Sequence, residues 1–500
     1  MQHTKRRKFL KDATKTAAAF TIVPRHVLGK GFVAPSDKVL VANIGCGTQG
    51  IYEMPGMLEN QDIQVVAVCD VNKYTTDYKD WSALRVKNTI RKTLGNESWG
   101  KFIKGIPGGR DVGHDFVSTY YAKDKASGRY RGCNVYEDYR ELLEKEEGID
   151  AVKIMTPDHH HAGIALAAMK KGIHVITHKP ISNRLEEGMK VIKAASDYDV
   201  RTHLLAYEDK PNYRLIKSWI DAGVIGNLKE IHNWSFRPVW PQYPDKFSEE
   251  MSIPDGFNWQ LWLGPEKDRP YHLNYTHNVF RGWFDFGGGS IADMGHYSLF
   301  PLFRELGIHK AAISARAYGS SSRTTVNQVC QSVQNTSAFP YSCMVKFQFD
   351  AQESLPAFDL FWYDGGMKPF APEELEAAGE DFDAEGMMFV GDGGKILAGF
   401  QGENPRILPQ SKMDGYTGKK TASEDKPERR SDVWVRAIRT GEESPGSFRY
   451  AGPVTETINL GAVALRAKER IEYNSVTQSI TNVESANKYL KRDYREGWEI

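Results

Sequence analysis

A glycine-rich turn between two apolar runs constrains the fold of this chain more than any other feature. The first run, Val39 to Ile44, is followed by Gly45, Gly47 and Gly50, which form the pattern GxGxxG. The second run, IQVVAVC, ends directly before Asp70, twenty residues beyond Gly50. A strand, a glycine turn opening a helix, and an acidic residue at this distance are typical of a dinucleotide-binding βαβ unit. The sequence therefore predicts such a unit near the start of the chain.

Each glycine of the turn has a physical role in that interpretation. Gly45 permits the tight turn, Gly47 lets the backbone approach a pyrophosphate, and Gly50 allows the helix to pack closely on the strand. The amino end of the helix then faces the phosphates. The predicted cofactor-binding residues of this turn are Gly45, Gly47, Thr48, Gln49 and Gly50.

Asp70 indicates which dinucleotide is bound. A carboxylate at the end of the second strand accepts hydrogen bonds from two ribose hydroxyls, but it repels a 2′-phosphate. The sequence therefore predicts NAD rather than NADP as the cofactor.

The chain continues with alternating strand and helix patterns, which indicate parallel βαβ units and an α/β fold. The run from Asn72 to Gly132 interrupts this alternation and is interpreted as an insertion. In parallel sheets, ligands bind beyond the carboxyl ends of the strands. The residues predicted to meet the cofactor at those ends are Thr156, Pro157, Asp158, His161 and His178.

Three consecutive histidines, His159 to His161, raise the question of a metal site. Neighbouring residues at a helix start point in different directions, unlike the i,i+4 histidines that bind one ion. We therefore predict no metal, and expect Asp158 and His161 to cap the helix and to lie at the cofactor edge.

The composition excludes other classes of protein. The formal net charge is +1, from 65 basic and 64 acidic residues, so no nucleic-acid partner is expected. The five cysteines lack CxxC spacing, and neither a complete disulfide framework nor a zinc site is predicted.

The amino-terminal segment predicts export. Arg6 and Arg7 precede a short apolar run, Ala17 to Val23, in a pattern that resembles a twin-arginine signal. The run is far shorter than the ~20 residues that span a bilayer, so no stable membrane insertion is expected. We assign residues 1–34 to the signal and its linker, which implies a periplasmic protein. The alternative is a solvated basic tail on a cytosolic protein.

Several motifs in order resemble the Gfo/Idh/MocA oxidoreductase family. These are the GxGxxG turn, the run from VYEDYRELL to VITHKPIS, and the later GWFDFGGGSIADMGHYSLFPLF. The resemblance extends from about Ser36 onward and implies a Rossmann domain over 35–207, with the insertion at about 72–132. It also implies a carboxy-terminal α/β domain over 208–500 with a large, mostly antiparallel open sheet, and a homo-oligomer.

Lys179 is the first predicted catalytic residue. Removing hydride from a sugar carbinol requires a group that takes the hydroxyl proton, and a lysine whose pKa is lowered by burial and by the nicotinamide charge suits this task. The family motif is Glu-Lys-Pro. Here Lys179 and Pro180 match, and His178 replaces the glutamate.

The second half of the site is expected in the segment GGGSIADMGHYSL. The family pattern Asp-x-Gly-x-His aligns with Asp293 and Gly295 and places Tyr297 at the histidine position. Tyr297 is the first candidate acid/base group, Asp293 is expected to orient Lys179 or the substrate, and His296 is the alternative. Arg281 and Trp283, directly before the glycines, are predicted to contact the substrate.

The expected function is an NAD-dependent oxidoreductase that acts on a hydroxyl of a sugar or glycoside, with a retained and internally recycled cofactor. The resemblance also allows an NAD-dependent glycoside hydrolase or lyase that oxidises the sugar transiently. A third hypothesis, from another class, is an inactive relative that only binds sugars.

Overall fold

The computed structural model describes residues 37–123, 130–424 and 426–500. The predicted twin-arginine segment, residues 1–34, lies outside the described residues. All elements below belong to one unit, residues 39–500. No helix in the described part of the chain has the length and apolar character needed to cross a membrane.

The first half of the described chain builds a parallel sheet of six strands, in the order β3-β2-β1-β4-β5-β6. This is the strand order of a Rossmann fold. The strands are β1 (Val39–Ile44), β2 (Ile63–Cys69), β3 (Asn134–Tyr136), β4 (Ala151–Ile154), β5 (His174–Thr177) and β6 (Thr202–Leu204). Buried β-branched side chains dominate the central strands, as expected for a sheet that is covered on both faces.

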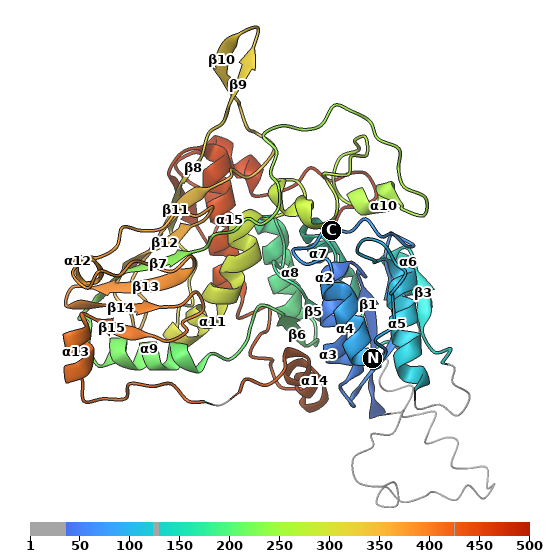
Figure 1. Cartoon of the computed structure of the whole chain (residues 1–500), viewed down its shortest axis with the longest axis horizontal. Helices are drawn as coiled ribbons and strands as arrows, with labels where there is room; N and C mark the ends of the chain where they lie inside the picture. Colours follow the sequence, from blue (N-terminus) through green and yellow to red (C-terminus); the bar gives the residue numbers. More distant parts are fainter. Residues whose placement is uncertain (1–36, 124–129, 425) are drawn as a thin grey trace, which may run out of the picture. The chain divides into compact units, whose positions relative to one another are not determined.

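Helices connect these strands on both faces of the sheet (Figure 1). They are α2 (Thr48–Glu53), α3 (Pro55–Leu58), α4 (Arg85–Leu94), α5 (Arg110–Ala122), α6 (Tyr139–Lys145), α7 (Asp158–Lys170) and α8 (Leu185–Asp197). Two of them, α4 and α5, lie within the region that the sequence indicates as an insertion after β2.

The second half builds a sheet of nine strands within the described residues, in the order β15-β14-β13-β7-β12-β11-β8-β16-β17. All neighbours in it are antiparallel except β7 and β12. The strands are β7 (Leu228–Trp234), β8 (Ser314–Gly319), β11 (Cys343–Phe349), β12 (Phe358–Tyr363), β13 (Gly386–Gly391), β14 (Gly394–Ala398), β15 (Arg406–Leu408), β16 (Ile471–Asn474) and β17 (Ser479–Ile480). The short strands β9 (Arg323–Val326) and β10 (Val329–Ser332) form a separate hairpin that projects away from this sheet (Figure 1).

The helical segments of the second half include a π-helical turn, η5, at the start of α11. They are α9 (Pro211–Asp221), α10 (Trp259–Leu263), η4 (His277–Gly282), η5 (Ile291–Gly295), α11 (His296–Leu306), α12 (Glu373–Glu376), α13 (Gln410–Gly415), α14 (Arg430–Thr440), α15 (Gly452–Ala467) and η6 (Glu484–Tyr489). Together the two sheets confirm the predicted fold class: a Rossmann domain followed by an α/β domain with a large, mostly antiparallel sheet.

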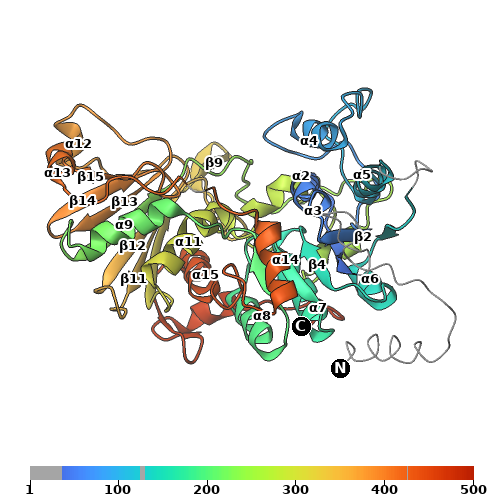
Figure 2. The same ribbon diagram turned by 90° about the horizontal axis from the view of Figure 1, so that it is seen from below.

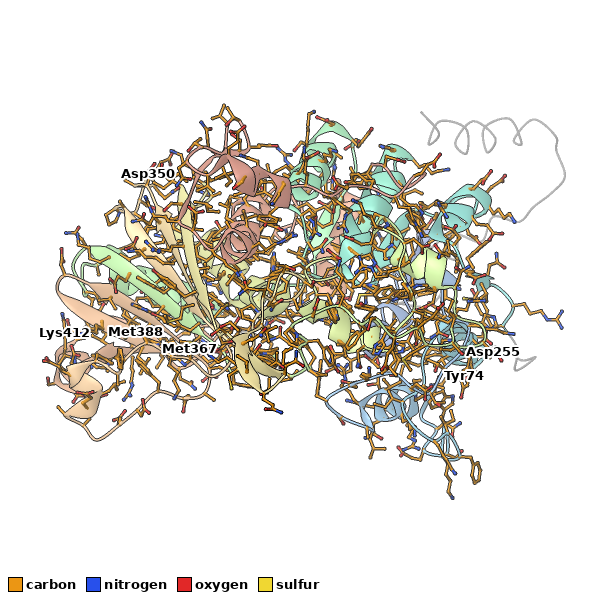
Figure 3. All side chains as sticks on the ribbon, turned by 90° about the horizontal axis from the view of Figure 1, so that it is seen from above. Tyr74, Asp255, Asp350, Met367, Met388 and Lys412 are labelled. Atoms are coloured by element: carbon orange, nitrogen blue, oxygen red, sulfur yellow. The ribbon has the colours of Figure 1, made fainter. Side chains whose placement is uncertain are left out.

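The two halves share one apolar core. Helix α8 of the parallel sheet packs on α15 of the second half, and both lie between the two sheets in Figure 2. One buried cluster includes Val175 on β5 and Phe347 on β11. The loops also meet, because Lys73 N donates to Gly256 O at 2.8 Å. Tyr74 and Asp255 mark this junction in Figure 3. The second half is thereby held against the carboxyl ends of the parallel strands.

Candidate active site

A cavity of about 490 Å³ lies where the carboxyl ends of the parallel strands face the second half of the chain. Of the predicted residues, those that line it are Gly45, Gly47, Thr48, Gln49, Gly50, Asp70, Thr156, Pro157, His178, Lys179, Arg281, Asp293 and Tyr297. The cavity therefore brings the glycine turn together with the expected proton-transfer groups.

Side chains at Gly45 and Gly50 would clash with the backbone, and one at Gly47 would be tightly packed. Gly45 has φ +103°, and a Cβ there would lie 2.5 Å from the backbone of Met155. A Cβ on Gly50 would lie 2.1 Å from the carbonyl oxygen of Gly45, and one on Gly47 would lie 3.1 Å from the ring of Tyr78. The backbone is therefore bare where β1 meets α2, as a dinucleotide cradle requires.

Asp70 is fixed at the end of β2. One carboxylate oxygen accepts from Cys46 N at 2.6 Å and the other from Asn72 N at 2.8 Å. Burial raises the pKa of Asp70, although these backbone hydrogen bonds oppose the shift. The carboxylate faces the cavity with lone pairs left for ribose hydroxyls, so the residues present fit a dinucleotide.

Lys179 is held by an ion pair. Its Nζ donates to Oδ1 of Asp293, and the same oxygen accepts from Arg281 Nε at 3.1 Å. Burial lowers the pKa of Lys179, since its side chain is only 2% exposed. Burial alone would raise the pKa of Asp293, but the two cations outweigh it and hold that pKa at about 2. One carboxylate thus serves two cations at the cavity wall.

His178 contacts Tyr297. Its Nε2 lies 3.0 Å from the phenolic oxygen. The Nζ of Lys179 lies 5.2 Å from the centre of the same phenol ring. Burial lowers the pKa of His178 well below its ordinary value and raises that of Tyr297, so both groups are neutral near pH 7. The residue that replaces the family glutamate is therefore an uncharged partner of the candidate acid/base group.

Only one of the two adjacent candidates faces the cavity. Tyr297 lines it, whereas His296 is fully buried and lies outside the lining. The Nδ1 of His296 lies 3.0 Å from Ala292 O, and burial lowers the pKa of this imidazole to about 4. The placement favours Tyr297 over His296 for proton transfer.

Asp158 and His161 differ from their predicted positions. Neither lines the cavity, and Asp158 does not cap α7; its Oδ2 accepts from Gly288 N at 3.1 Å instead. The ring nitrogens of His161 lie 2.6 Å from Pro180 O and 2.8 Å from Thr156 O. Both side chains face inward from the start of α7 and make hydrogen-bond contacts with the loops around the site.

Trp283 also differs from its prediction. It is buried at 2% exposure, donates from Nε1 to Asn274 O at 2.8 Å and lies outside the cavity lining. Its ring packs with Tyr243, Phe247 and Tyr275. Trp283 therefore stabilises the loop that carries Arg281 and has no access to a substrate in the cavity.

The histidine run does not gather metal ligands. Nε2 of His159 and Nε2 of His160 both lie near Trp262 O, at 2.9 and 2.7 Å. Among the residues that the structure describes, no three His, Cys, Asp or Glu side chains come together as a possible metal site.

Several cavity residues were missed by the sequence reasoning. Arg430 at the start of α14 lies with its guanidinium 5.9 Å from the Tyr297 ring and 3.8 Å from Glu208. Arg237 and Trp498 also line the cavity. No local motif marks these positions, because they reach the cavity only through the long-range packing of the second half.

Comparison with known proteins shows similarity to one family. A profile described as "Oxidoreductase family, NAD-binding Rossmann fold" matches residues 115–205, and one described as "Oxidoreductase family, C-terminal alpha/beta domain" matches residues 210–314. Residues 115–205 and 210–314 thus match the two domain profiles of the Gfo/Idh/MocA family of oxidoreductases. NAD is therefore the cofactor of this Rossmann domain, in agreement with the glycine turn and Asp70.

Curated relatives within the Gfo/Idh/MocA family match part of the chain. A levoglucosan dehydrogenase from Pseudarthrobacter phenanthrenivorans is 32% identical over 124 residues, 23% of this chain and 31% of that protein. Glycosyl hydrolase family 109 protein 1 from Akkermansia muciniphila is 25% identical over 209 residues, 41% of this chain and 35% of that protein. The matches thus span about a third of the length of each relative.

The fold of this chain is also seen among solved structures. The WlbA dehydrogenase from Bordetella pertussis, in complex with NADH and UDP-GlcNAcA, superposes with a TM-score of 0.50 at 14% identity. The match covers 87% of this chain and 99% of that one, so the two-domain architecture is shared.

Proposed function

We propose that this protein is an NAD-dependent oxidoreductase acting on a hydroxyl group of a sugar or glycoside. The observation that carries the proposal is the ion pair of Lys179 with Asp293, on the same cavity as the glycine turn and Tyr297. The named relatives, a levoglucosan dehydrogenase and a glycosyl hydrolase, both act on carbohydrate and support this substrate class.

The bound NAD would supply the hydride acceptor. Burial lowers the pKa of Lys179, and its neutral form takes the proton of the hydroxyl as the hydride leaves its carbon. The ammonium ion that forms is stabilised by Asp293, which Arg281 keeps ionised and in place. Tyr297 is protonated near neutral pH and can therefore donate a proton to a carbonyl oxygen when hydride returns to its carbon.

We propose further that NAD is retained and recycled within each cycle. An exported enzyme has no obvious pool of NAD, so release of reduced cofactor would stop it after one turnover. Two chemistries close the cycle. In one, a first sugar is oxidised and a second carbonyl compound is reduced. In the other, the ketone formed from a glycoside acidifies the neighbouring C–H, and the glycosidic substituent leaves with a proton. In a hydrolase, water then adds to the enone before hydride returns to the carbonyl; in a lyase, hydride returns without that addition.

The levoglucosan dehydrogenase supports the sugar-oxidation step that both chemistries share, and the glycosyl hydrolase supports the second chemistry. The candidate of another class, a sugar-binding relative without activity, is suggested by His178 at the glutamate position. The intact Lys179–Asp293 pair and the bare glycine cradle favour an enzyme.

One experiment separates these functions. Purified protein is dialysed, its nicotinamide content is measured, and absorbance in the reduced-nicotinamide band is followed after sugars or glycosides are added. Stoichiometric bound NAD and a sugar-dependent change support the proposal. Protein that is purified without bound nicotinamide and consumes added NAD in proportion to sugar is an ordinary dehydrogenase. Saturable sugar binding without a change in absorbance identifies the inactive binder.

We also propose a homo-oligomer. One face of the large sheet keeps apolar side chains partly exposed, among them Met344, Phe361 and Val390. A second copy covering this face would bury them. Light scattering of the purified protein tests this, and a monomeric mass contradicts it.

A further inference from the structure

Residues 491–500, here called the closing segment, fold back onto the Rossmann half of the structure. In Figure 1 the end of the drawn chain lies beside α7 and α10. This placement puts Trp498 into the lining of the cofactor cavity, although it is about 430 residues beyond Asp70 in the sequence. The sequence pattern of the Rossmann domain gives no sign of this contribution.

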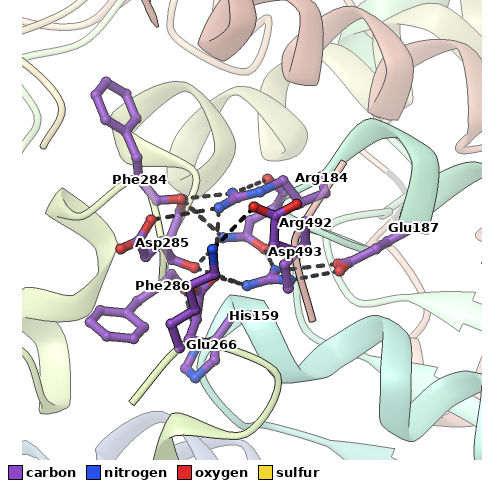
Figure 4. Close-up of polar contacts among 12 residues, drawn as sticks. His159, Arg184, Glu187, Glu266, Phe284, Asp285, Phe286, Arg492 and Asp493 are labelled. Carbon is purple, nitrogen blue, oxygen red and sulfur yellow. Dashed lines mark hydrogen bonds and ion pairs between the residues drawn. The ribbon is translucent and has the colours of Figure 1, made fainter. Parts of the chain in front are cut away.

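Buried charges anchor the closing segment (Figure 4). Arg492 is 2% exposed; its Nε donates to Glu187 at 2.7 Å and its Nη2 to Asn183 at 2.6 Å. Its Nη1 also pairs with Glu266. Because Glu187 and Glu266 are themselves buried, withdrawing Arg492 would leave carboxylates without their main partner in an apolar environment. The segment is therefore fixed at its start to α8 and to the loop after α10.

Further hydrogen bonds continue along the closing segment. The hydroxyl of Tyr494 donates to Glu187 at 3.0 Å. Arg495 N donates to Pro265 O at 3.0 Å, and its Nη2 donates to Gln260 O at 2.6 Å. Trp498 N then donates to Arg495 O at 3.1 Å. These bonds hold the indole of Trp498 in a defined position.

The indole of Trp498 lies among groups of the Rossmann half. The Arg140 guanidinium is 4.3 Å from the ring centre. The rings of His160 and Tyr139, which also line the cavity, lie 6.0 and 6.4 Å away. The guanidinium of Arg495 lies 5.4 Å from the same ring centre, so two cationic groups lie over the indole, which stays half-buried.

The location of these groups identifies the end of the cavity. Tyr139 begins α6, shortly after β3, and the end of β3 adjoins Asp70, because Asp70 N donates to Tyr136 O at 3.2 Å. In a Rossmann domain the acidic residue at the end of β2 binds the ribose of the adenosine. Trp498 is therefore at the adenosine end, opposite the end that carries Lys179 and Tyr297.

We propose that Trp498, held by the closing segment, covers the adenosine of bound NAD and slows its release. An indole presents a flat apolar surface that suits an adenine ring. Because Arg492 and Arg495 hold the segment in place, moving Trp498 away from the adenosine requires bonded groups to move. The inference rests on NAD binding alone and does not depend on the sugar chemistry of the proposed function.

The test compares the rate of NADH dissociation in three proteins, measured by displacement with excess NAD. Trp498→Ala should release NADH about tenfold faster or more, which is the effect expected when one base–aromatic stack is lost. Trp498→Phe keeps a flat ring and should stay within about threefold of the unaltered protein. Phe370→Ala, which removes an aromatic side chain that is 99% exposed, is the matched control and should change nothing.

Melting temperature and the far-ultraviolet circular dichroism spectrum verify that each variant is folded. An unchanged dissociation rate in folded Trp498→Ala overturns the proposal. An equal acceleration in Phe370→Ala also overturns it, because the effect would then be unrelated to the cavity. A protein that retains NAD through Trp498 but transforms no sugar would contradict only the proposed function.

Discussion

The phenolic oxygen of Tyr297 lies 3.0 Å from Nε2 of His178, directly beside Lys179. In the Glu-Lys-Pro pattern of the family, a carboxylate would occupy the position of this imidazole. Burial keeps His178 neutral, so it gives the Lys179 ammonium no ionic support. Burial and Arg281 therefore lower the pKa of Lys179 and favour its neutral form, whereas Asp293 raises that pKa and favours the ammonium form.

His178→Glu should shift the pH dependence of turnover. The neutral lysine is the active form, so kcat/KM rises with pH through the pKa of Lys179. A carboxylate at position 178 stabilises the ammonium and raises that pKa, so the rise moves to higher pH. His178→Gln adds no charge and should leave the profile in place. A profile that is the same in both variants contradicts this account of Lys179.

Lys179→Ala should remove most turnover without emptying the cofactor site. Loss of a positioned acid/base group is expected to cost about 3 kcal/mol or more, a hundredfold or greater fall in kcat/KM. Asp293 keeps its bond from Arg281, so the cavity wall stays in place. Nicotinamide content and kcat/KM are measured together. Lys171→Ala, at an exposed helix end, is the control and should behave like the unaltered protein.

Tyr297→Phe removes only the hydroxyl from the candidate acid/base group. We expect a fall in kcat of about a hundredfold. His296→Asn keeps a donor near Ala292 O and should have little effect, because His296 lies outside the cavity. The reverse ranking of the two variants would assign the role to His296.

Asp70→Ala should weaken NAD binding. It should also reduce the difference between the affinities for NAD and NADP, because the repulsion of a 2′-phosphate disappears. Asp70→Asn separates charge from hydrogen bonding, since an amide oxygen still accepts from one backbone N–H of Cys46 or Asn72. Calorimetric titration with both cofactors gives the two affinities. If the unaltered protein already binds NADP more tightly than NAD, the reading of Asp70 is wrong.

Replacement of Arg6 and Arg7 by lysine should trap the protein inside the cell. The twin-arginine pattern predicts recognition of both guanidinium groups, and lysine keeps only the charge. Immunoblots of periplasmic and cytoplasmic fractions measure the distribution. If the variant is exported as well as the unaltered protein, the proposal of a twin-arginine route is wrong.

The parts of the site that the sequence revealed are those set by local structure. Strand ends determine the positions of the glycines after β1, of Asp70 after β2 and of Lys179 after β5. The structure places all of them on the cavity. Asp158 and His161 lie away from the cavity because the start of a helix presents side chains both to the cavity and to the packed interior. The sequence has no local signal that separates these directions.

Long-range packing explains the rest. Trp283 is predicted to contact the substrate from its position directly before the glycines, but a cluster of aromatic residues buries it. Arg430 and Trp498 line the cavity, but they belong to segments that come next to it only through the folding of the second half. The order of the nine-stranded sheet has the same origin, since β7 lies between β12 and β13 in space but not in sequence.

Three tryptophans, Trp81, Trp262 and Trp498, line the cavity that binds the cofactor. Indole emits in the band where reduced nicotinamide absorbs, and oxidised nicotinamide does not absorb there. The chain therefore carries energy-transfer donors next to its own acceptor. We expect indole fluorescence to fall and nicotinamide fluorescence to appear whenever the bound cofactor is reduced, so the protein can report the redox state of its cofactor without an added dye.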